Sequence, residues 1–382
     1  MEGIENYIFV AALLIIVIII TYIFNKLTMK SKKCATIKQY NNYTPIALSD
    51  LSVSATDTPN KSMFDVSLNS VFVKTAYNCC CTGNFKNDYV DTCALENCYN
   101  QGARALHFEV YLLNNKPVIA SSSISQPKYK EIYNELDFYT TMKTVNKLFT
   151  SKSNDPLFLI LEINSDKYKT YESVYNALYE IFGLNSVDGN RIMFFDSSTQ
   201  NFGDVKLFDL IGKVVIMVSY KSGNVDNFNK SGLKNITTVN LSLSDKNKMI
   251  KYNTFINAIS SLNEDQSLFV ESISKYNNGI TVLIPDKQAY NQNYDFISTG
   301  IRSGITFTAL NFQYNDEQIK NYNKIFGSAL IGTNSFLLKK NKNKDTNIYY
   351  SPSIQAFYKK KTEEITTPIS STDIELYNAI YK

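Results

Sequence analysis

Five polar residues that could do chemistry share one kind of position in the sequence. Each lies in or just after an apolar run that predicts a β-strand, and they are Tyr77, Asn78, His107, Glu109 and Glu162. His107 and Glu109 are two residues apart, so on a strand their side chains point to the same side. If these strand ends meet, two carboxylates, an amide oxygen and an imidazole surround one point. Such a set of ligands suits a cation.

The histidine content restricts the chemistry further. His107 is the only histidine in the chain. Any mechanism that needs two histidines within this chain is therefore excluded, as are H-E-x-x-H zinc sites and Cys₂His₂ fingers. A lone histidine on a strand is more often a core residue with its polar atoms satisfied than a metal ligand, so both interpretations of His107 stay open.

The composition favours a globular body over a nucleic-acid binder. The content of hydrophobic residues is 44%, enough for a sizeable core, and the net charge is only +4. Proteins that bind nucleic acids usually show a stronger and clustered basic excess, so no nucleic-acid partner is expected. The abundance of Asn, Lys, Ile and Tyr, with only three arginines, is typical of an AT-rich genome.

An apolar segment without charge lies near the N-terminus, at residues 7–24. A helix of this length spans roughly 27 Å, close to the thickness of a bilayer core. Its length and the acidic residues before it favour a retained anchor over a cleaved signal peptide. Lys26, Lys30, Lys32 and Lys33 follow the segment. The positive-inside rule then places the remaining chain in the cytosol. We expect a single-pass protein of a viral or host membrane.

The cysteines are too few for a disulfide scaffold in a chain of this length. They are Cys34, Cys79, Cys80, Cys81, Cys93 and Cys98. Adjacent cysteines cannot easily share one tetrahedral ion, so the triplet is expected to be half-buried loop residues rather than a zinc or thiol site. In the cytosol all six would stay reduced. Cys93 and Cys98 could pair if the topology were inverted.

Short apolar runs alternate with helical patterns along the chain. The runs that predict strands are 70–73, 105–113, 116–120, 156–163, 213–218, 279–284 and 305–312. Between two of them, Val174, Leu178 and Ile181 recur at helical spacing, and Gly183 is placed to end that helix. The strands are almost continuously apolar, as expected when both faces are covered. The pattern predicts an α/β fold with a parallel sheet, open or closed into a (β/α)₈ barrel.

The composition also divides the chain into segments. We expect a membrane anchor with its basic flank, a linker, a main domain and a polar tail at residues 1–33, 34–65, 66–340 and 341–382. The main domain is predicted to consist of a first half, a polar surface excursion and a second half at about 66–221, 222–248 and 249–340.

Motifs within the main domain resemble those of the phosphatidylinositol-specific phospholipase C family. That family has a strand followed by Ser-x-His-Asn-Thr-Tyr-Leu-x-Gly, and KTAYNCCCTG (74–83) aligns with it from Asn78 to Gly83. The family's next strand, Gly-Cys-Arg-x-x-Glu-x-Asp-x-Trp, is similar to GARALHFEVY (102–111). Further similar motifs follow in the family's order: PVIASS (117–122), LILEINS (159–165), IGKVVIMV (211–218), YDFISTG (294–300) and ALNFQ (309–313). The resemblance implies a distorted TIM barrel.

The resemblance also implies which residues stand at the catalytic positions. The family cleaves phosphoinositides with one histidine as base and another as acid. These two positions correspond to Tyr77 and Ser121 in this chain. Neither replaces an imidazole, because an unperturbed tyrosine titrates near 10 and a serine hydroxyl is weaker still. Losing both groups would lower the rate by roughly 10⁴-fold or more.

The binding positions of the family are kept only in part. Of its calcium ligands, Asn78 and Glu162 match, Glu109 replaces an aspartate, and His107 replaces a glutamate, so calcium is expected to bind weakly or not at all. The positions that contact phosphate and headgroup are substituted as well. They correspond to Met217, Ser219, Val282 and Ile284.

These substitutions predict a protein that keeps the fold of the family but not its chemistry. The favoured hypothesis is a membrane-anchored, catalytically inactive barrel that binds a phosphoinositide of the membrane, an inositol phosphate or a protein partner. One alternative is a residual phosphoric diester hydrolase that acts on phosphatidylinositol lipids with non-standard groups. A second alternative is a structural membrane or virion protein.

Overall fold

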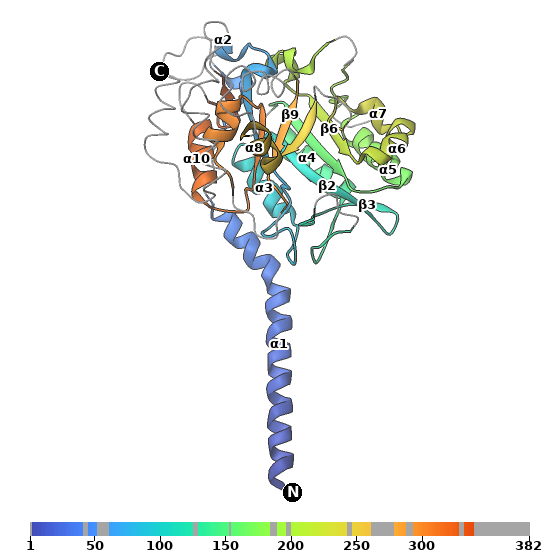
Figure 1. Ribbon diagram of the computed structural model, residues 1–382, viewed down its shortest axis with the longest axis vertical. Coiled ribbons are helices and arrows are strands. Elements are labelled where there is room, and N and C mark those ends of the chain that lie inside the picture. Colours follow the sequence, from blue (N-terminus) through green and yellow to red (C-terminus); the bar gives the residue numbers. More distant parts are fainter. Residues whose placement is uncertain are drawn as a thin grey trace.

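The fold is known from a computed structural model that covers most of the chain. It describes residues 2–40, 45–51, 61–124, 129–152, 154–183, 189–195, 200–242, 247–260, 279–287, 293–327 and 332–339. The predicted polar tail at 341–382 lies outside the described residues. Figure 1 shows an α/β body from which one long helix projects.

Within the described residues, eight parallel strands form a nearly closed barrel (Figure 1). In sheet order they are β7 (Val239–Asn240), β6 (Val214–Tyr220), β5 (Leu157–Ile163), β2 (Ala105–Leu113), β1 (Val71–Ala76), β10 (Phe307–Leu310), β9 (Thr281–Ile284) and β8 (Lys248–Lys251). Three strands add to this sheet in antiparallel pairs: β3 (Lys116–Ala120) on β2, β4 (Leu136–Asp137) on β3, and β11 (Phe336–Leu338) on β1. The prediction of an α/β barrel is confirmed.

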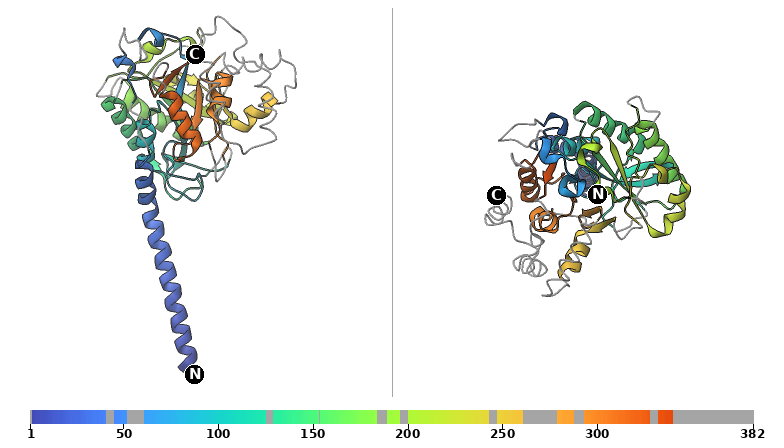
Figure 2. Two further views of the ribbon diagram at one scale, coloured as in Figure 1. Left: turned by 90° about the vertical axis from the view of Figure 1, so that its left-hand side faces the viewer. Right: turned by 90° about the horizontal axis from the view of Figure 1, so that it is seen from above.

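Helices surround the strands, as the view from above in Figure 2 shows. They are α3 (Thr92–Asn100), α4 (Phe138–Lys152), α5 (Tyr168–Phe182), α6 (Val225–Lys230), α7 (Leu233–Ile236), α8 (Tyr252–Ser260) and α10 (Glu317–Phe326). Short helical turns are α2 (Lys61–Phe64), η1 (Leu48–Asp50), η2 (Leu68–Ser70), η3 (Phe202–Asp204), η4 (Leu207–Leu210), η5 (Ser222–Asn224) and η6 (Ile297–Ile301). Helix α5 buries Val174, Leu178 and Ile181 and ends before Gly183, as their spacing predicts.

The described residues of the segment 222–248 belong to the barrel, so the prediction of a polar surface excursion is wrong for them. This segment contains α6, α7 and β7, and β8 begins at its end. Its apolar residues are few, but Phe228, Leu233, Ile236 and Val239 are all buried. β7 has only two residues, and β8 has two apolar residues between two lysines, so neither gives an apolar run. They stand at the two ends of the sheet order. Lysines such as those of β8 are common on edge strands, because they hinder pairing with other chains.

Helix α1 (Glu2–Lys38) is the projecting helix in Figure 1. Its apolar residues from Tyr7 to Phe24 are exposed. By length and composition α1 could cross a membrane. It runs past the predicted end of the anchor at residue 33, because the residues that follow are held against the barrel.

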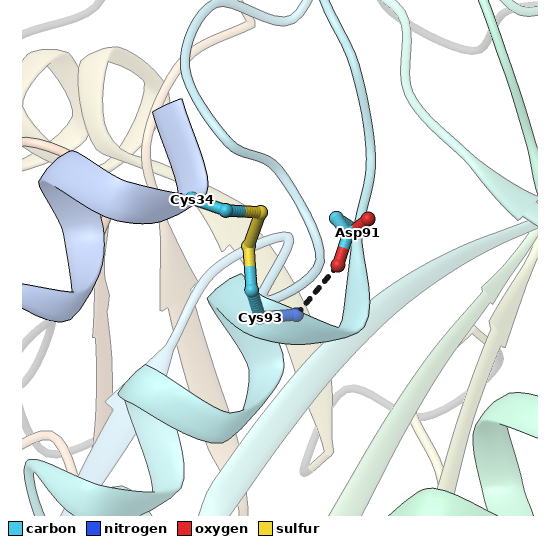
Figure 3. Close-up of side chains that lie close together, drawn as sticks. All are labelled: Cys34, Asp91 and Cys93. Atoms are coloured by element: carbon cyan, nitrogen blue, oxygen red, sulfur yellow. Dashed lines mark hydrogen bonds between the residues drawn. A yellow bond between two sulfur atoms is a disulfide. The ribbon is translucent and has the colours of Figure 1, made fainter. Parts of the chain in front are cut away.

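Three bonds attach the end of α1 to α3 and to the loop after β1. A disulfide joins Cys34 to Cys93 (Figure 3). Lys30 Nζ lies 2.7 Å from Asp91 Oδ2, and Lys33 pairs with the buried Asp88. Asp91 also caps α3, because its carboxylate accepts a hydrogen bond from the backbone N–H of Cys93 at 2.8 Å.

The close approach of Lys33 explains the glycine at position 83. A Cβ atom on Gly83 would lie 2.4 Å from Asp88 Oδ2 and 2.6 Å from Lys33 Nζ. Any larger residue would therefore push the two charged groups apart. The glycine and the ion pair together fix where the helix meets the barrel.

The predicted linker at 34–65 is also corrected, since its described residues pack against the barrel. Ile37, Leu48 and Leu51 are buried. The backbone N–H of Leu48 donates a hydrogen bond to Asp155 Oδ1 at 2.8 Å. Asp155 in turn pairs with the buried Arg104 at 3.0 Å. The segment is polar in composition, yet its few apolar residues meet the body of the protein.

The disulfide contradicts the expectation that all cysteines are reduced. Cys93 pairs with Cys34 and not with Cys98, because Cys34 lies on the continuation of α1 that docks beside α3. Cys34, Asp91 and Cys93 form the one group with spacing suited to a metal among the described residues, but the two sulfur atoms are bonded to each other. The triplet Cys79–Cys81 and Cys98 are free and buried. Burial raises the pKa of Cys79, Cys81 and Cys98, so these thiols stay protonated.

Replacing Cys93 by serine tests the attachment. The disulfide closes a loop between residues 59 apart in sequence, so Cys93→Ser should lower the free energy of unfolding by about 2–4 kcal/mol. Urea denaturation of the full chain in detergent measures this. Cys34→Ser is the matched control, because it breaks the same bond. The double variant should then be no less stable than either single variant, and additive losses would contradict the disulfide.

Candidate functional site

The polar residues predicted from the sequence converge inside the barrel, at the carboxyl ends of its strands. Glu109 on β2 pairs in register with Glu162 on β5, which pairs with Ser219 on β6. His107 and Met217 lie two residues earlier on β2 and β6 and form the next layer down. Parallel strands in register place these side chains on one face, which is the interior of the barrel. The carboxyl ends of the strands are also where barrel enzymes carry their active sites.

A lysine not singled out in the sequence lies between the two carboxylates. Lys287 follows β9, and its Nζ atom is 3.2 Å from Glu109 Oε2 and 2.9 Å from Glu162 Oε1. Its side chain is only 1% exposed. Burial alone lowers the pKa of a lysine, but the two carboxylates outweigh it and raise the pKa of Lys287. The ammonium group is therefore charged at neutral pH.

Glu109 is the most fully hydrogen-bonded group of the site. It accepts hydrogen bonds from Asn78 Nδ2 at 2.6 Å, from the Tyr111 hydroxyl at 2.6 Å and from Asn164 Nδ2 at 3.4 Å. Burial raises the pKa of Glu109 although Lys287 opposes the shift. These contacts leave the carboxylate no free direction toward a ligand from outside.

Glu162 has the opposite pKa shift. Burial would raise its pKa, but Lys287 and then His107 outweigh this and lower the pKa to about 2. His107 Nε2 lies 3.5 Å from Glu162 Oε2. On the other side of the ring, His107 Nδ1 lies 3.3 Å from the backbone nitrogen of Asn78 and 3.1 Å from its Oδ1. Asn78 has a positive φ of 40°, a conformation that asparagine tolerates better than most residues.

Tyr77, predicted to stand at the position of the first family histidine, packs as a core side chain. Its ring stacks on His107 with 4.6 Å between centroids, and Phe85 meets it edge-on at 5.6 Å. The hydroxyl is buried without a hydrogen-bond partner among the described residues. Burial, followed by the charges of Glu109 and Glu162, raises the pKa of Tyr77 well above its ordinary value. A phenolate base is therefore strongly disfavoured here.

Ser121, predicted to stand at the position of the second family histidine, directly follows β3 and is fully buried. Its Oγ lies 3.4 Å from Asn78 Nδ2, and the thiol of Cys81 lies near it. These partners are neutral, so nothing in these contacts would lower the pKa of the hydroxyl. Ser121 lies in the site but lacks an activating base among these partners.

The four positions for phosphate and headgroup do not form a polar pocket. Met217, Val282 and Ile284 are buried apolar residues on β6 and β9. Ser219 is half-buried beside Glu162. None of the four carries a positive charge, so they offer a phosphate group no ionic partner.

The residues present do not fit a calcium ion. Calcium takes six to eight oxygen ligands at about 2.3–2.6 Å. Here the ammonium group of Lys287 contacts both carboxylates. Asn78 turns its Nδ2 toward Glu109 and its Oδ1 toward His107. Both oxygens of Glu109 and Oε1 of Glu162 are therefore already engaged within the protein, whereas Glu162 Oε2 has no hydrogen-bond partner among the described residues.

Sequence analysis missed Lys287, Tyr111 and Asn164, although each had a signal. Lys287 is the first basic residue after the predicted strand 279–284. Tyr111 and Asn164 stand two residues after Glu109 and Glu162, so each projects on the same side as its neighbour. What the sequence did not indicate is that Lys287 reaches across the barrel.

Comparison with known proteins supports the fold. No protein-family model matches the chain, and no curated protein does. Among solved structures it is similar to PLC21 of L. pealei and of S. officinalis, each with 14% identity and a TM-score of 0.56. These matches cover 75% of this chain but 39% of theirs, so the chain spans well under half of their length. A calcium-dependent phosphoinositol-specific phospholipase C from Pseudomonas sp also matches, with 9% identity, a TM-score of 0.43 and coverage of 69% and 95%. The likeness to the two PLC21 structures confirms the predicted barrel as a fold.

The lowered pKa of Glu162 predicts how the site depends on pH. A lowered pKa contributes stability that is present above the ordinary value of 4.5 and is lost as the pH falls toward 2. Glu162→Gln should therefore be less stable than the wild type at pH 7 by about 3 kcal/mol. The difference should shrink between pH 4.5 and pH 2, where the wild-type carboxylate becomes protonated. Denaturation at a series of pH values measures it, with the exposed Glu317→Gln as control. A difference that is the same at pH 7 and pH 2 would contradict the ion pair.

Proposed function

We propose that this chain is a membrane-anchored barrel of the phospholipase C fold that binds a partner at a membrane without cleaving a phosphoric diester. The observation that carries the proposal is the buried ring of Tyr77, stacked on His107 where a catalytic base would stand. With Ser121 at the second position, the site lacks both the base and the acid. General acid–base catalysis supplies about 10²–10⁴-fold for each group, so turnover of a phosphoinositide is not expected.

The attachment of α1 supports a role at a membrane surface. The helix docks on Asp88 and Cys93, in the loop and the helix that follow β1. Tyr40, just after α1, donates a hydrogen bond to the backbone carbonyl of Gln313, which follows β10. These segments lie at the carboxyl ends of strands, so the anchor meets the barrel at the end that holds the site. A membrane around residues 7–24 would then lie on the same side as the mouth of the barrel.

A further feature fits a lipid surface. Ile124 and Tyr129 are exposed near Ser121, on the loop after β3. Exposed apolar side chains beside an anchor can enter the boundary of a bilayer. The ligand is therefore expected among phosphoinositides of the membrane, soluble inositol phosphates or a protein at the membrane. It would bind at the rim, because Lys287 occupies the space between Glu109 and Glu162 inside the barrel.

An assay of the full chain tests the absence of catalysis. The protein in micelles containing phosphatidylinositol should release no inositol phosphate, with calcium or with a chelator. Glu162→Ala serves as the background, and an active calcium-dependent phospholipase C as the positive control. Release that needs calcium and is lost in Glu162→Ala would establish the hydrolase alternative and overturn the proposal.

Binding is measured separately, with the chain in nanodiscs. Retention of a labelled inositol phosphate, or enrichment of phosphatidylinositol around the protein, would support the binding function. If neither occurs and no protein partner is retained, the chain would be better described as a structural membrane protein.

The compartment of the barrel is a distinct part of the proposal. The lysines after the apolar segment predict a cytosolic barrel, but the Cys34–Cys93 disulfide favours an oxidising compartment. Lys30 and Lys33 have another reason to be basic, because they pair with Asp91 and Asp88. This second role weakens them as a signal of topology. We therefore propose that the barrel faces an oxidising compartment.

Glycosylation in a eukaryotic cell decides between the two orientations. Asn42, Asn60, Asn229, Asn235 and Asn240 stand in Asn-x-Ser/Thr sequences, which are modified only on the non-cytosolic side. On that side, treatment with an N-glycosidase should increase the mobility of the full chain on a gel, and Asn→Gln variants should abolish the change. A chain without glycan, whose Cys34 reacts with maleimide in intact cells, would support the cytosolic orientation instead.

A further inference from the structure

We propose that Lys287 is the resident cation of this barrel. Its ammonium group holds the position between Glu109 and Glu162 that a divalent ion would otherwise take, so the folded chain binds no calcium or magnesium there. The inference concerns ion binding alone. It can fail or succeed independently of whether the chain cleaves or binds a lipid.

The charges of the two neighbouring carboxylates require compensation. Glu109 and Glu162 are neighbours in register, and both are buried. Two ionised carboxylates cannot share a buried space without a positive charge beside them, or else one of them must take up a proton. Lys287 supplies the charge, at 3.2 Å from one and 2.9 Å from the other. One tethered ammonium thereby serves both groups.

Lys287 approaches these carboxylates from a strand that is not adjacent to theirs. Lys287 follows β9, and the sheet order places β10 and β1 between β9 and β2. The side chain therefore reaches Glu109 across the interior of the barrel and not along a neighbouring strand. A lysine has a long aliphatic stem that can lie among apolar residues while its charged end meets polar ones. The crossing fills the same space that an ion and its bound waters would need.

The geometry around the ammonium group of Lys287 is that of hydrogen bonds and not that of metal coordination. Distances of 2.9 and 3.2 Å are those of hydrogen bonds from a nitrogen donor, and they exceed the 2.3–2.6 Å of calcium–oxygen bonds. Asn78 points its Nδ2 atom at Glu109 and its Oδ1 atom at His107. A calcium ion would have to displace the ammonium group and turn Asn78 around, which leaves a buried lysine without a partner. Such an uncompensated charge is strongly unfavourable.

The same geometry predicts what happens when the lysine is shortened. Lys287→Ala removes the charge and opens space beside the carboxylates, the Asn78 amide and His107. These carboxylate, amide and imidazole groups resemble the incomplete cation site predicted from the sequence. Lys287→Met removes the same charge but keeps the length of the side chain, so it blocks the space. Only the alanine variant should therefore gain an ion site.

Thermal unfolding of the full chain in detergent, with calcium or with a chelator, is the first test. The wild type should unfold at the same temperature in both. Both variants should unfold at lower temperatures in the chelator. With calcium at about a hundred times its dissociation constant, the folded-to-unfolded ratio of Lys287→Ala should rise about a hundredfold, while that of Lys287→Met should not change.

Terbium emission is the second test, because it reports the ion directly. The chain has no tryptophan, and the rings of Tyr77 and Tyr111, which contact His107 and Glu109, would sensitise an ion bound there. Lys287→Ala should give saturable emission that calcium competes away. The wild type and Lys206→Ala, which breaks an exposed ion pair with Asp65, should give none.

Two outcomes would overturn the inference. One is calcium-dependent stabilisation of the wild type that disappears in Glu162→Gln, since the ion would then displace the lysine. The other is a Lys287→Ala protein that folds but takes up neither calcium nor terbium. If Lys287→Ala does not fold, the wild type decides: indifference to calcium together with a destabilised Lys287→Met supports the inference, and stabilisation by calcium refutes it.

Discussion

Two carboxylates inside one barrel require a positive charge beside them, and the ammonium group of Lys287 meets that requirement. Glu109 and Glu162 are brought together by the register of β2 and β5, so neither can leave without breaking the sheet. Their charges in turn hold Lys287 across the barrel and orient Asn78 and His107 around them. The arrangement at the carboxyl ends of the strands thus follows from one electrostatic constraint.

This constraint also explains why Glu109 is held within the protein. Here Glu109 accepts from Asn78, Tyr111 and Asn164 in addition to Lys287, and the ring of Tyr77 covers one face of His107. Such satisfied polar groups stabilise the fold, whereas Glu162 Oε2 and His107 Nε2 have no hydrogen-bond partner among the described residues. The polar residues at the carboxyl ends of the strands are thus a buried part of the core.

Helix α1 and the barrel are joined close to the candidate site. Lys30, Lys33 and Cys34 all bind to the segment that begins where β1 ends. The same segment supplies Asn78 to the site and Gly83 to the helix contact. A change in how α1 sits would therefore be transmitted to the mouth of the barrel over a short stretch of chain, and a covalent bond limits such a change.

The sequence by itself determined the class of fold, the approximate positions of seven strands and the apolar helix, because these depend on local patterns and on the identity of residues. The lone His107 likewise excluded a two-histidine mechanism by count alone. Only the tertiary structure decided that Lys287 meets Glu109 and Glu162, that Cys34 pairs with Cys93, and that β7 and β8 complete the barrel. The ion pairs and the disulfide join residues far apart in sequence. β7 and β8 contain too few apolar residues to leave a pattern. A sequence fixes which charges and thiols exist, but distance decides which of them meet.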